Sequence, residues 1–195
     1  EYQVRAVLQT SLEENLAMIA DSVRYLKAQG RRVFFDAEHF FDGYKLDREY
    51  ALQSLRVALD AGADRLVLCD TNGGTLPAEI AEIVSDVKES LGDDAVLGIH
   101  SHNDTDTAVA SAIAAIEAGA TQVQGCINGY GERTGNANMI SIIGNLNLKM
   151  GVQVISDEQL STLTEVSNFV SERVNRSPFP FQPFVCSSAF THKGG

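Results

Sequence analysis

The chain lacks several features that would place it in a special class of protein. It has no tryptophan, only four prolines, and three cysteines, Cys69, Cys126 and Cys186, which form no Cys-x-x-Cys pair. An odd and scattered set of cysteines argues against a disulfide scaffold and favours reduced thiols in the cytoplasm. No stretch approaches the roughly 18 apolar residues of a membrane-spanning helix, and the first residues do not form a signal peptide.

Basic residues are also scarce. Fifteen Lys and Arg face 26 Asp and Glu, which gives a formal net charge of −11. Nucleic acids and anionic membranes need a basic surface, so neither is an expected partner. A phosphate-bearing cofactor would need a local basic pocket. With 44% hydrophobic and 21% charged residues, the composition is that of an ordinary folded globular protein.

The segment His100-Ser101-His102 stands out among what is present. It closes an apolar run, 95–99, that is typical of a buried β-strand. Side chains at positions i and i+2 of a strand point to the same face, so both imidazoles would project together at the strand end. Two neutral imidazoles can bind one divalent cation if further ligands complete the shell. His-x-His pairs also occur by chance at strand ends, so the spacing alone leaves a structural role open.

The chain repeats one plan four times. A helical pattern ends at a glycine, a few small or polar residues follow, and a short apolar run comes next. The glycines are Gly30, Gly62, Gly92 and Gly119, and the runs are 33–35, 66–69, 96–99 and 122–125. Glycine ends a helix in the left-handed conformation at no steric cost, so each repeat predicts a helix that leads into a buried strand.

Apolar periodicity and capping residues place the helices. We expect helices over 11–29, opened by a capping box of Thr10 and Glu13, over 47–61, over 77–91, over 107–118, from 136 through 143, and from 156 to 175. Residues 1–9 are predicted to be the tail of a preceding strand or its loop. The proline-rich segment 177–183 can be neither helix nor central strand and is predicted to be a linker.

Strands joined by helical crossovers of this length form either a doubly wound sheet or a (β/α)8 barrel. In a barrel the chemistry lies at the carboxyl ends of the strands. Each predicted strand ends in polar, ligand-capable residues: Asp36-Ala37-Glu38-His39, Asp70-Thr71-Asn72, 100–104, and 126–136. A purely structural repeat would not need them, so a metal-dependent enzyme becomes the favoured interpretation.

These residues resemble a known family. His-x-His-Asn-Asp at 100–104, followed by Gly-Glu-Arg-Thr-Gly-Asn-Ala at 131–137, resembles the metal-dependent Claisen-condensing enzymes of the isopropylmalate, homocitrate and citramalate synthase superfamily. These are (β/α)8 TIM barrels related to 3-hydroxy-3-methylglutaryl-CoA lyase. The stretches 36–44 and 68–76 are most similar to the citramalate synthase branch. One position departs from the family pattern, because Asp106 stands where a glycine is common.

The resemblance implies roles for five residues. His100 and His102 would be metal ligands, and Asn136 would supply a third contact through its amide oxygen. Thr71 would bind the carboxylate of the 2-oxo acid, and Glu38 would be catalytic. A turn-capping role for Thr71 and a solvated loop carboxylate for Glu38 remain open from the residues themselves.

The implied activity is condensation of acetyl-CoA with a short 2-oxo acid, most similar to citramalate formation from pyruvate, in branched-chain amino-acid biosynthesis. The cofactor would be a divalent metal, Mg²⁺, Mn²⁺ or Zn²⁺, with acetyl-CoA as co-substrate, in a homodimeric full-length protein. The alternatives are 2-isopropylmalate or homocitrate synthesis, carbon–carbon cleavage by a lyase or aldolase on the same scaffold, and a non-catalytic half-barrel.

The family's aspartate ligand and its neighbouring arginine, which lie on the first strand of the barrel, are not found in this chain. About 250 residues are typical of such barrels, and only four βα units are visible here. We therefore expect residues 1–176 to be the C-terminal half of a TIM-barrel catalytic domain. Residues 177–195 would form a linker and the start of a following subdomain. On that expectation the chain alone would be inactive.

Overall fold

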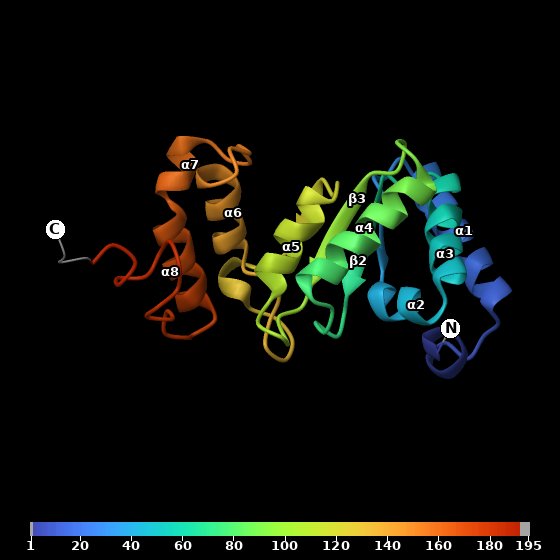
Figure 1. The fold of residues 1–195 in the computed structure, drawn as a ribbon, viewed down its shortest axis with the longest axis horizontal. Helices are drawn as coiled ribbons and strands as arrows, with labels where there is room; N and C mark the ends of the chain where they lie inside the picture. Colours follow the sequence, from blue (N-terminus) through green and yellow to red (C-terminus); the bar gives the residue numbers. More distant parts are fainter. Residues whose placement is uncertain (1, 192–195) are drawn as a thin grey trace. The chain divides into compact units, whose positions relative to one another are not determined.

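The computed structural model describes residues 2–191 (Figure 1). The chain divides into two compact units, Glu1–Gln124 and Gly125–Gly195, and each is described by itself. The domain boundary after residue 176 remains a prediction. The expected subdomain start at 177–195 lies partly outside the described residues.

The first unit is built on a parallel four-stranded sheet. Its strands are β1 (Phe34–Ala37), β2 (Arg65–Asp70), β3 (Leu97–Ser101) and β4 (Gln122–Gln124), and they lie side by side in chain order. Each strand pairs in parallel with the next, and the register places His100 beside Cys69 on one side and Gln124 on the other. The four predicted strands and their single direction of winding are therefore confirmed.

Helices precede each strand as predicted: α1 (Leu12–Ala28), α3 (Arg48–Asp60), α4 (Pro77–Leu91) and α5 (Ala108–Glu117). In Figure 1, α4 and α5 run alongside β2 and β3. The glycines that end these helices, Gly30, Gly62, Gly92 and Gly119, all have a positive φ, between +70° and +109°. Residues with a Cβ rarely adopt this conformation, which explains why glycine recurs at the same place in each repeat.

One face of the sheet forms the core with these helices. Strand residues Leu66, Leu68 and Ile99 are 0% exposed, as are Leu55 of α3 and Ile80 of α4. Burying a side chain of this size contributes about 1.5–3 kcal/mol. Each strand alternates, so the residues between these apolar ones point to the opposite face. That opposite face carries the polar side chains of the candidate site.

Three details of the first unit differ from the sequence prediction. The N-cap of α1 is Ser11, whose side chain accepts a hydrogen bond from the Glu14 backbone N–H, so the predicted capping box at Thr10 is wrong by one residue. A short helix, α2 (Phe40–Leu46), was not predicted. Residues Gln3–Val7 form a π-helical turn, η1, where a strand tail or loop was expected.

The second unit is helical. It contains the 3-10 turn η2 (Ile127–Gly129), then α6 (Met139–Leu148), α7 (Asp157–Ser161) and α8 (Leu163–Arg173). Its core is formed by Ile140, Leu163 and Val185, with partly buried apolar side chains around them. Residues 177–183 form neither helix nor strand, as their prolines predicted.

The prediction of one helix from residue 156 to 175 is wrong, because the helix breaks at Thr162. A capping box between Ser156 and Gln159 opens α7. The Thr162 hydroxyl then donates to the Gln159 carbonyl at 2.8 Å, and the Thr162 backbone N–H also donates to it at 3.1 Å. A side chain that bonds to a backbone carbonyl of the preceding turn competes with helix continuation, so a new helix begins at Leu163.

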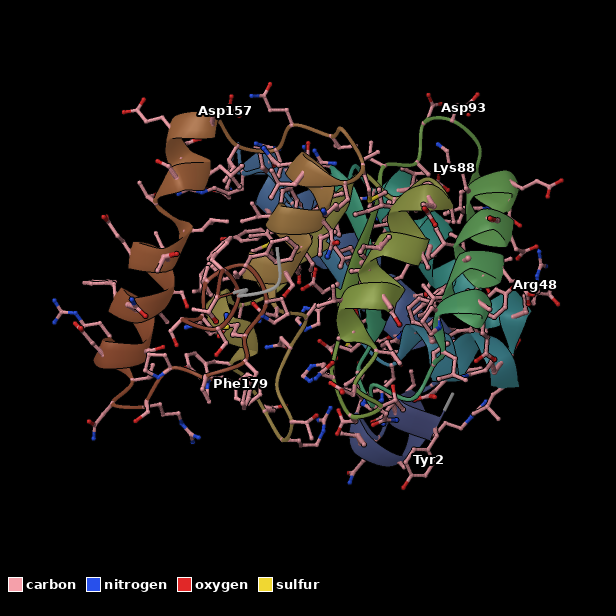
Figure 2. All side chains as sticks on the ribbon, turned by 60° about the vertical axis from the view of Figure 1, so that its left-hand side comes forward. Tyr2, Arg48, Lys88, Asp93, Asp157 and Phe179 are labelled. Carbon is pink, nitrogen blue, oxygen red and sulfur yellow. The ribbon has the colours of Figure 1, made fainter. Side chains whose placement is uncertain are left out.

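The end of α4 shows how charged side chains complete the fold. Lys88, labelled in Figure 2, donates to the carbonyls of Gly92, Asp93 and Ala95 at 3.2–3.4 Å. These carbonyls lie just beyond the helix end at Leu91, so the ammonium group of Lys88 holds the turn that leads from α4 toward β3. None of the helices in residues 2–191 combines the length and apolarity needed to cross a lipid bilayer.

Candidate metal and substrate site

The two histidines lie together at the carboxyl end of β3. His100 is inside the strand and His102 follows it, and their rings stack with centroids 5.2 Å apart and planes at 29°. His102 is 9% exposed and its backbone N–H donates to the Asp70 carbonyl at 3.3 Å. The geometry expected from a spacing of two residues on a strand is therefore present, with both imidazoles on one face of the sheet.

His100 is held by a neighbouring side chain. Its Nδ1 lies 2.7 Å from Oε1 of Gln124 on β4. The amide Nε2 of Gln124 donates in turn to the Asp36 carboxylate on β1 at 3.0 Å. A ring nitrogen that is held in this way fixes the orientation of the imidazole and leaves the other nitrogen, Nε2, as the one that can bind a cation.

Cys69 shares this face of the sheet with Asp36 and Glu38. Burial raises the pKa of the Cys69 thiol, and the negative charges of Glu38 and Asp36 raise it further. The thiol therefore stays protonated at neutral pH. A protonated thiol is neither a nucleophile nor a metal ligand, so Cys69 is a packing residue beside His100.

The loops after β2 and β3 are packed tightly against each other. A Cβ on Gly73 would lie 2.8 Å from the Asp104 backbone nitrogen and 2.9 Å from the His102 carbonyl carbon, so only glycine fits there. The Thr105 hydroxyl donates to the Gly73 carbonyl at 2.9 Å. Asp106 adopts a positive φ of 59°, which explains why a glycine is common at this position of the family pattern.

Asp70 closes the loop that carries Thr71. The Asp70 side chain is 2% exposed and accepts hydrogen bonds from the backbone N–H and the hydroxyl of Thr75, at 3.3 and 3.1 Å. Burial raises the pKa of the Asp70 carboxyl, and the bonds from Thr75 oppose that shift. The result is a fixed turn over residues 70–75 that directs Thr71 toward the loop after β1.

Glu38 and Thr71 are in direct contact. The Thr71 hydroxyl donates to Oε2 of Glu38 at 2.8 Å and accepts from the His39 backbone N–H at 2.7 Å. Nearby, Asn72 donates to the Asp42 carboxylate at 2.5 Å. The two residues predicted for catalysis and substrate binding are therefore brought together, although 33 positions separate them in the sequence.

A cavity of about 790 Å³ opens beside β1. Apolar side chains such as Ile19, Phe35 and Leu46 line it, and it reaches Glu38 and Asn72 at the carboxyl end of the strand. A volume of this size is in the range of small-molecule sites. Because β1 has no neighbouring strand on its outer side within residues 2–191, the cavity also marks the open edge of the sheet.

Asn136 belongs to the second unit, in the loop that follows η2. Its amide Nδ2 donates to the Tyr130 carbonyl and to the Cys126 sulfur, each at 3.2 Å. These bonds fix the amide with its nitrogen toward the loop and its oxygen on the opposite side. Gly135, with a φ of +101°, lies so close to the Gly129 carbonyl that no other residue fits. The loop is therefore built to hold one orientation of Asn136.

The residues present fit part of a divalent metal site. Two imidazoles on one face and an oriented amide are donors that borderline cations accept, and at least one anionic ligand would be expected to join them. In residues 2–191 no group of three or more His, Cys, Asp and Glu side chains is placed to hold a metal. The two imidazoles of the first unit are therefore two donors of a metal site that would need further ligands to be complete.

A family model named HMGL-like matches residues 1–170. The chain belongs to the HMGL-like family. It is 57% identical over 194 residues to an (R)-citramalate synthase of Synechocystis sp., covering 96% of this chain and 36% of that protein. It is 59% identical over 196 residues to an (R)-citramalate synthase of Aquifex aeolicus, covering 100% of this chain and 37% of that protein. The chain thus spans little more than a third of these relatives.

More distant members of the family match the same region. A 2-isopropylmalate synthase of Sulfolobus acidocaldarius is 37% identical over 189 residues, covering 96% of this chain and 47% of that protein. Among solved structures, an HMG-CoA lyase from Acinetobacter baumannii superposes with a TM-score of 0.73 at 19% identity, covering 97% of this chain and 64% of that chain. The predicted resemblance to the citramalate synthase branch and the predicted partial (β/α)8 barrel are both confirmed.

Sequence reasoning missed Gln124, which joins His100 to Asp36. A signal was present, because β4 carries two glutamines, Gln122 and Gln124, on the same face. Strands of a parallel sheet that is covered on both faces are usually apolar throughout. Two amides in a strand of three residues therefore indicate a polar interior at this position.

Proposed function

We propose that the protein containing this chain condenses acetyl-CoA with pyruvate, in a divalent-metal-dependent reaction that yields citramalate and free CoA. One observation carries the choice of substrate. Curated relatives named (R)-citramalate synthase are 52–59% identical to this chain, whereas those named 2-isopropylmalate or homocitrate synthase are 34–37% identical. We also propose that the full-length protein is a homodimer that acts in the cytoplasm, in branched-chain amino-acid biosynthesis.

His100, His102 and Asn136 would hold the metal, together with a carboxylate from another part of the protein. A bound divalent cation supplies Lewis acidity, which polarises the keto oxygen of a 2-oxo acid. The orientation of His100 by Gln124, and of Asn136 by Tyr130, prepares these ligands before the cation binds.

The hydrogen bond between Thr71 and Glu38 suggests how substrate binding prepares the proton transfer. A hydroxyl has one proton to donate, so Thr71 can give it either to Glu38 or to a substrate carboxylate. The Thr71 oxygen keeps its bond from the His39 N–H in either case, which holds the hydroxyl in place while it rotates. Binding of the 2-oxo acid would therefore release Glu38 from this bond.

Glu38 would then take part in removing a proton from the methyl group of acetyl-CoA. The resulting carbon nucleophile forms a bond to the keto carbon of pyruvate, and the keto oxygen takes up a proton. Water finally cleaves the thioester, which gives a carboxylate and releases CoA. The contribution of Thr71 and the metal ligands is to hold the two reacting carbons in a productive orientation.

The test uses the full-length protein with acetyl-CoA, Mn²⁺ or Mg²⁺, and one of three 2-oxo acids: pyruvate, 2-oxoisovalerate or 2-oxoglutarate. We expect free CoA thiol to appear fastest with pyruvate and not to appear without a 2-oxo acid. A preference for one of the other acids would contradict the citramalate assignment, and no thiol release with any of them would refute the synthase proposal. Cleavage of 3-hydroxy-3-methylglutaryl-CoA instead would support the lyase alternative.

Two isosteric variants test the roles of the residues. Glu38→Gln keeps the shape and the ability to accept a hydrogen bond from Thr71 but cannot take a proton, so we expect kcat to fall by about 10²–10⁴-fold. Thr71→Val removes the hydroxyl and should raise the KM for pyruvate, whereas Thr71→Ser should restore it. Equal kcat values for Glu38→Gln and the unaltered protein would exclude Glu38 from proton transfer.

A further inference from the structure

We propose that Gln124 is a positioning residue for His100, and that Asp36 sets the direction of the Gln124 amide. The inference rests on the proposed function, because it assigns His100 to a metal site. It adds two residues that touch neither the substrate nor the metal. Their effect would be to decide which nitrogen of His100 faces the cation.

The contacts define a chain of three side chains on three strands. In the parallel register, Gln124 of β4 is paired with His100 of β3, so the two side chains leave the sheet side by side. The Gln124 carbonyl oxygen lies 2.7 Å from Nδ1 of His100, and its Nε2 lies 3.0 Å from the Asp36 carboxylate.

The carboxylate fixes the direction of this chain. An ionised carboxylate only accepts hydrogen bonds, so the end of the Gln124 amide that faces Asp36 must be the NH₂ group. The end that faces His100 is then the carbonyl oxygen, which also only accepts. Nδ1 of His100 must therefore carry the proton, and Nε2 carries the lone pair that a metal requires.

The contact between Asp36 and Gln124 depends on the curvature of the sheet. Their strands, β1 and β4, are three positions apart, which corresponds to roughly 14 Å along the sheet at about 4.8 Å per strand. The two side chains bridge that distance because the sheet curves toward this face. Asp36 on β1 thus constrains His100, the proposed metal ligand, on β3, which is two strands away.

Gln122 provides a matched control within the same strand. It points to the same face two residues earlier, but its side chain packs against Gly98 rather than a histidine. Its Oε1 is buried and has no hydrogen-bond partner within the described part of the chain. A substitution there disturbs the same interior without touching the three-membered chain.

The experiment measures Mn²⁺ binding to the full-length protein, by electron paramagnetic resonance of the free ion, without substrates. We expect Gln124→Leu to weaken Mn²⁺ binding by about 10–100-fold, because loss of an outer partner has that effect on a ligating histidine. Gln122→Leu should bind Mn²⁺ as the unaltered protein does. In turnover assays, saturating Mn²⁺ should restore most of the kcat of Gln124→Leu, since the loss lies in metal affinity.

A second variant separates positioning from general packing. The double substitution Asp36→Asn with Gln124→Glu exchanges the two groups: the new amide donates to the new carboxylate, and an oxygen still faces Nδ1 of His100. We expect this variant to retain Mn²⁺ affinity. It keeps the shape and the number of hydrogen bonds, so it remains informative if Gln124→Leu fails to fold.

The outcomes are distinct. Unchanged Mn²⁺ affinity in Gln124→Leu, equal losses in Gln124→Leu and Gln122→Leu, or weakened binding in the exchanged pair would each overturn the inference while leaving the metal site intact. Failure of the unaltered protein to bind Mn²⁺ would remove the metal site itself and the inference with it. Absence of condensation activity despite Mn²⁺ binding would contradict only the proposed reaction.

Discussion

The second unit should be sensitive to substitution of Asn128. Its Nδ2 donates to the Ser167 carbonyl at 2.8 Å and to the Ser171 hydroxyl at 3.0 Å. Its Oδ1 accepts from the Ser167 hydroxyl at 2.6 Å and from the Gln182 amide at 2.9 Å. One side chain thus joins η2 to α8 and to the segment that follows α8. All three partners are at least 95% buried, so bulk water has little access to the groups that lose their bonds in Asn128→Ala.

The size of the effect follows from the groups left without a partner. The Ser167 hydroxyl and the Gln182 amide lose a hydrogen bond, while Ser171 keeps a contact with Tyr130 and the Ser167 carbonyl keeps its place in the hydrogen-bond ladder of α8. Each buried unsatisfied group costs about 1–3 kcal/mol, and neighbouring losses are not additive, so we take about 1 kcal/mol for each of the two. Asn128 also has a positive φ of 62°, which costs alanine roughly 1 kcal/mol more. The total is about 3 kcal/mol.

Hydrogen exchange of the central α8 amides, followed by mass spectrometry on the full-length protein, measures this loss locally. A cost of about 3 kcal/mol corresponds to roughly 150-fold faster exchange. Asn175→Ala is the control, because Asn175 also has a positive φ, of 53°, but is exposed and carries only the backbone cost. That control should accelerate exchange about fivefold for about 1 kcal/mol. If both variants accelerate exchange equally, the Asn128 hydrogen bonds do not stabilise this unit.

Three further outcomes are expected. Leu55→Ala should lower the free energy of unfolding by about 2–5 kcal/mol, because the Leu55 side chain is 0% exposed. The urea midpoint measures this loss, and a change well below that range would contradict the packing described. Gly135→Ala should weaken Mn²⁺ binding, because a Cβ there collides with the Gly129 carbonyl; unchanged calorimetric titration would argue against a role for this loop. The pKa of Asp64 is held below its usual range, chiefly by hydrogen bonds from Lys27, so its stabilising effect is present at neutral pH and lost as the pH falls below about 4. Lys27→Met should therefore flatten the acid side of the melting-temperature profile, and an unchanged profile would refute this assignment.

The repeating part of the fold could be predicted because its signals are local. A glycine at each helix end and an apolar run after it are read within a few residues, and the predicted helices agree with α3, α4 and α5 to within one residue at each end. The short helix α2 was not predictable in this way. It begins after His39 in a left-handed conformation with no side-chain cap, and it is stabilised by burial of Phe40 and Phe41. Tertiary packing, which a local pattern does not contain, decides its existence.

The same distinction between local signals and long-range packing applies to the candidate site. The projection of His100 and His102 from the same face follows from the two-residue period of a strand and was expected. The contact between Gln124 and Asp36 joins residues 88 positions apart and depends on how strongly the sheet curves. Curvature results from the twist and packing of all four strands, so no short stretch of sequence specifies it.

The turns that enter the strands and the segments that follow them differ in which residues adopt a left-handed backbone conformation. The turns that enter the strands place glycine at every positive φ: Gly30, Gly62, Gly92 and Gly119. The segments that follow the strands place glycines at positive φ as well, Gly73, Gly129 and Gly135, but they also place residues with side chains there: His39, Asp106, Asn128 and Arg133.

Glycine would adopt those conformations without the roughly 1–2 kcal/mol that a Cβ costs. Retaining a side chain there is therefore explained only where the side chain makes compensating contacts or acts on a ligand. Asn128 recovers the cost through four hydrogen bonds, and Asp106 accepts one from Asn103. The turns that enter the strands thus hold only glycine at positive φ, whereas the segments that follow the strands also hold residues whose side chains make contacts of their own.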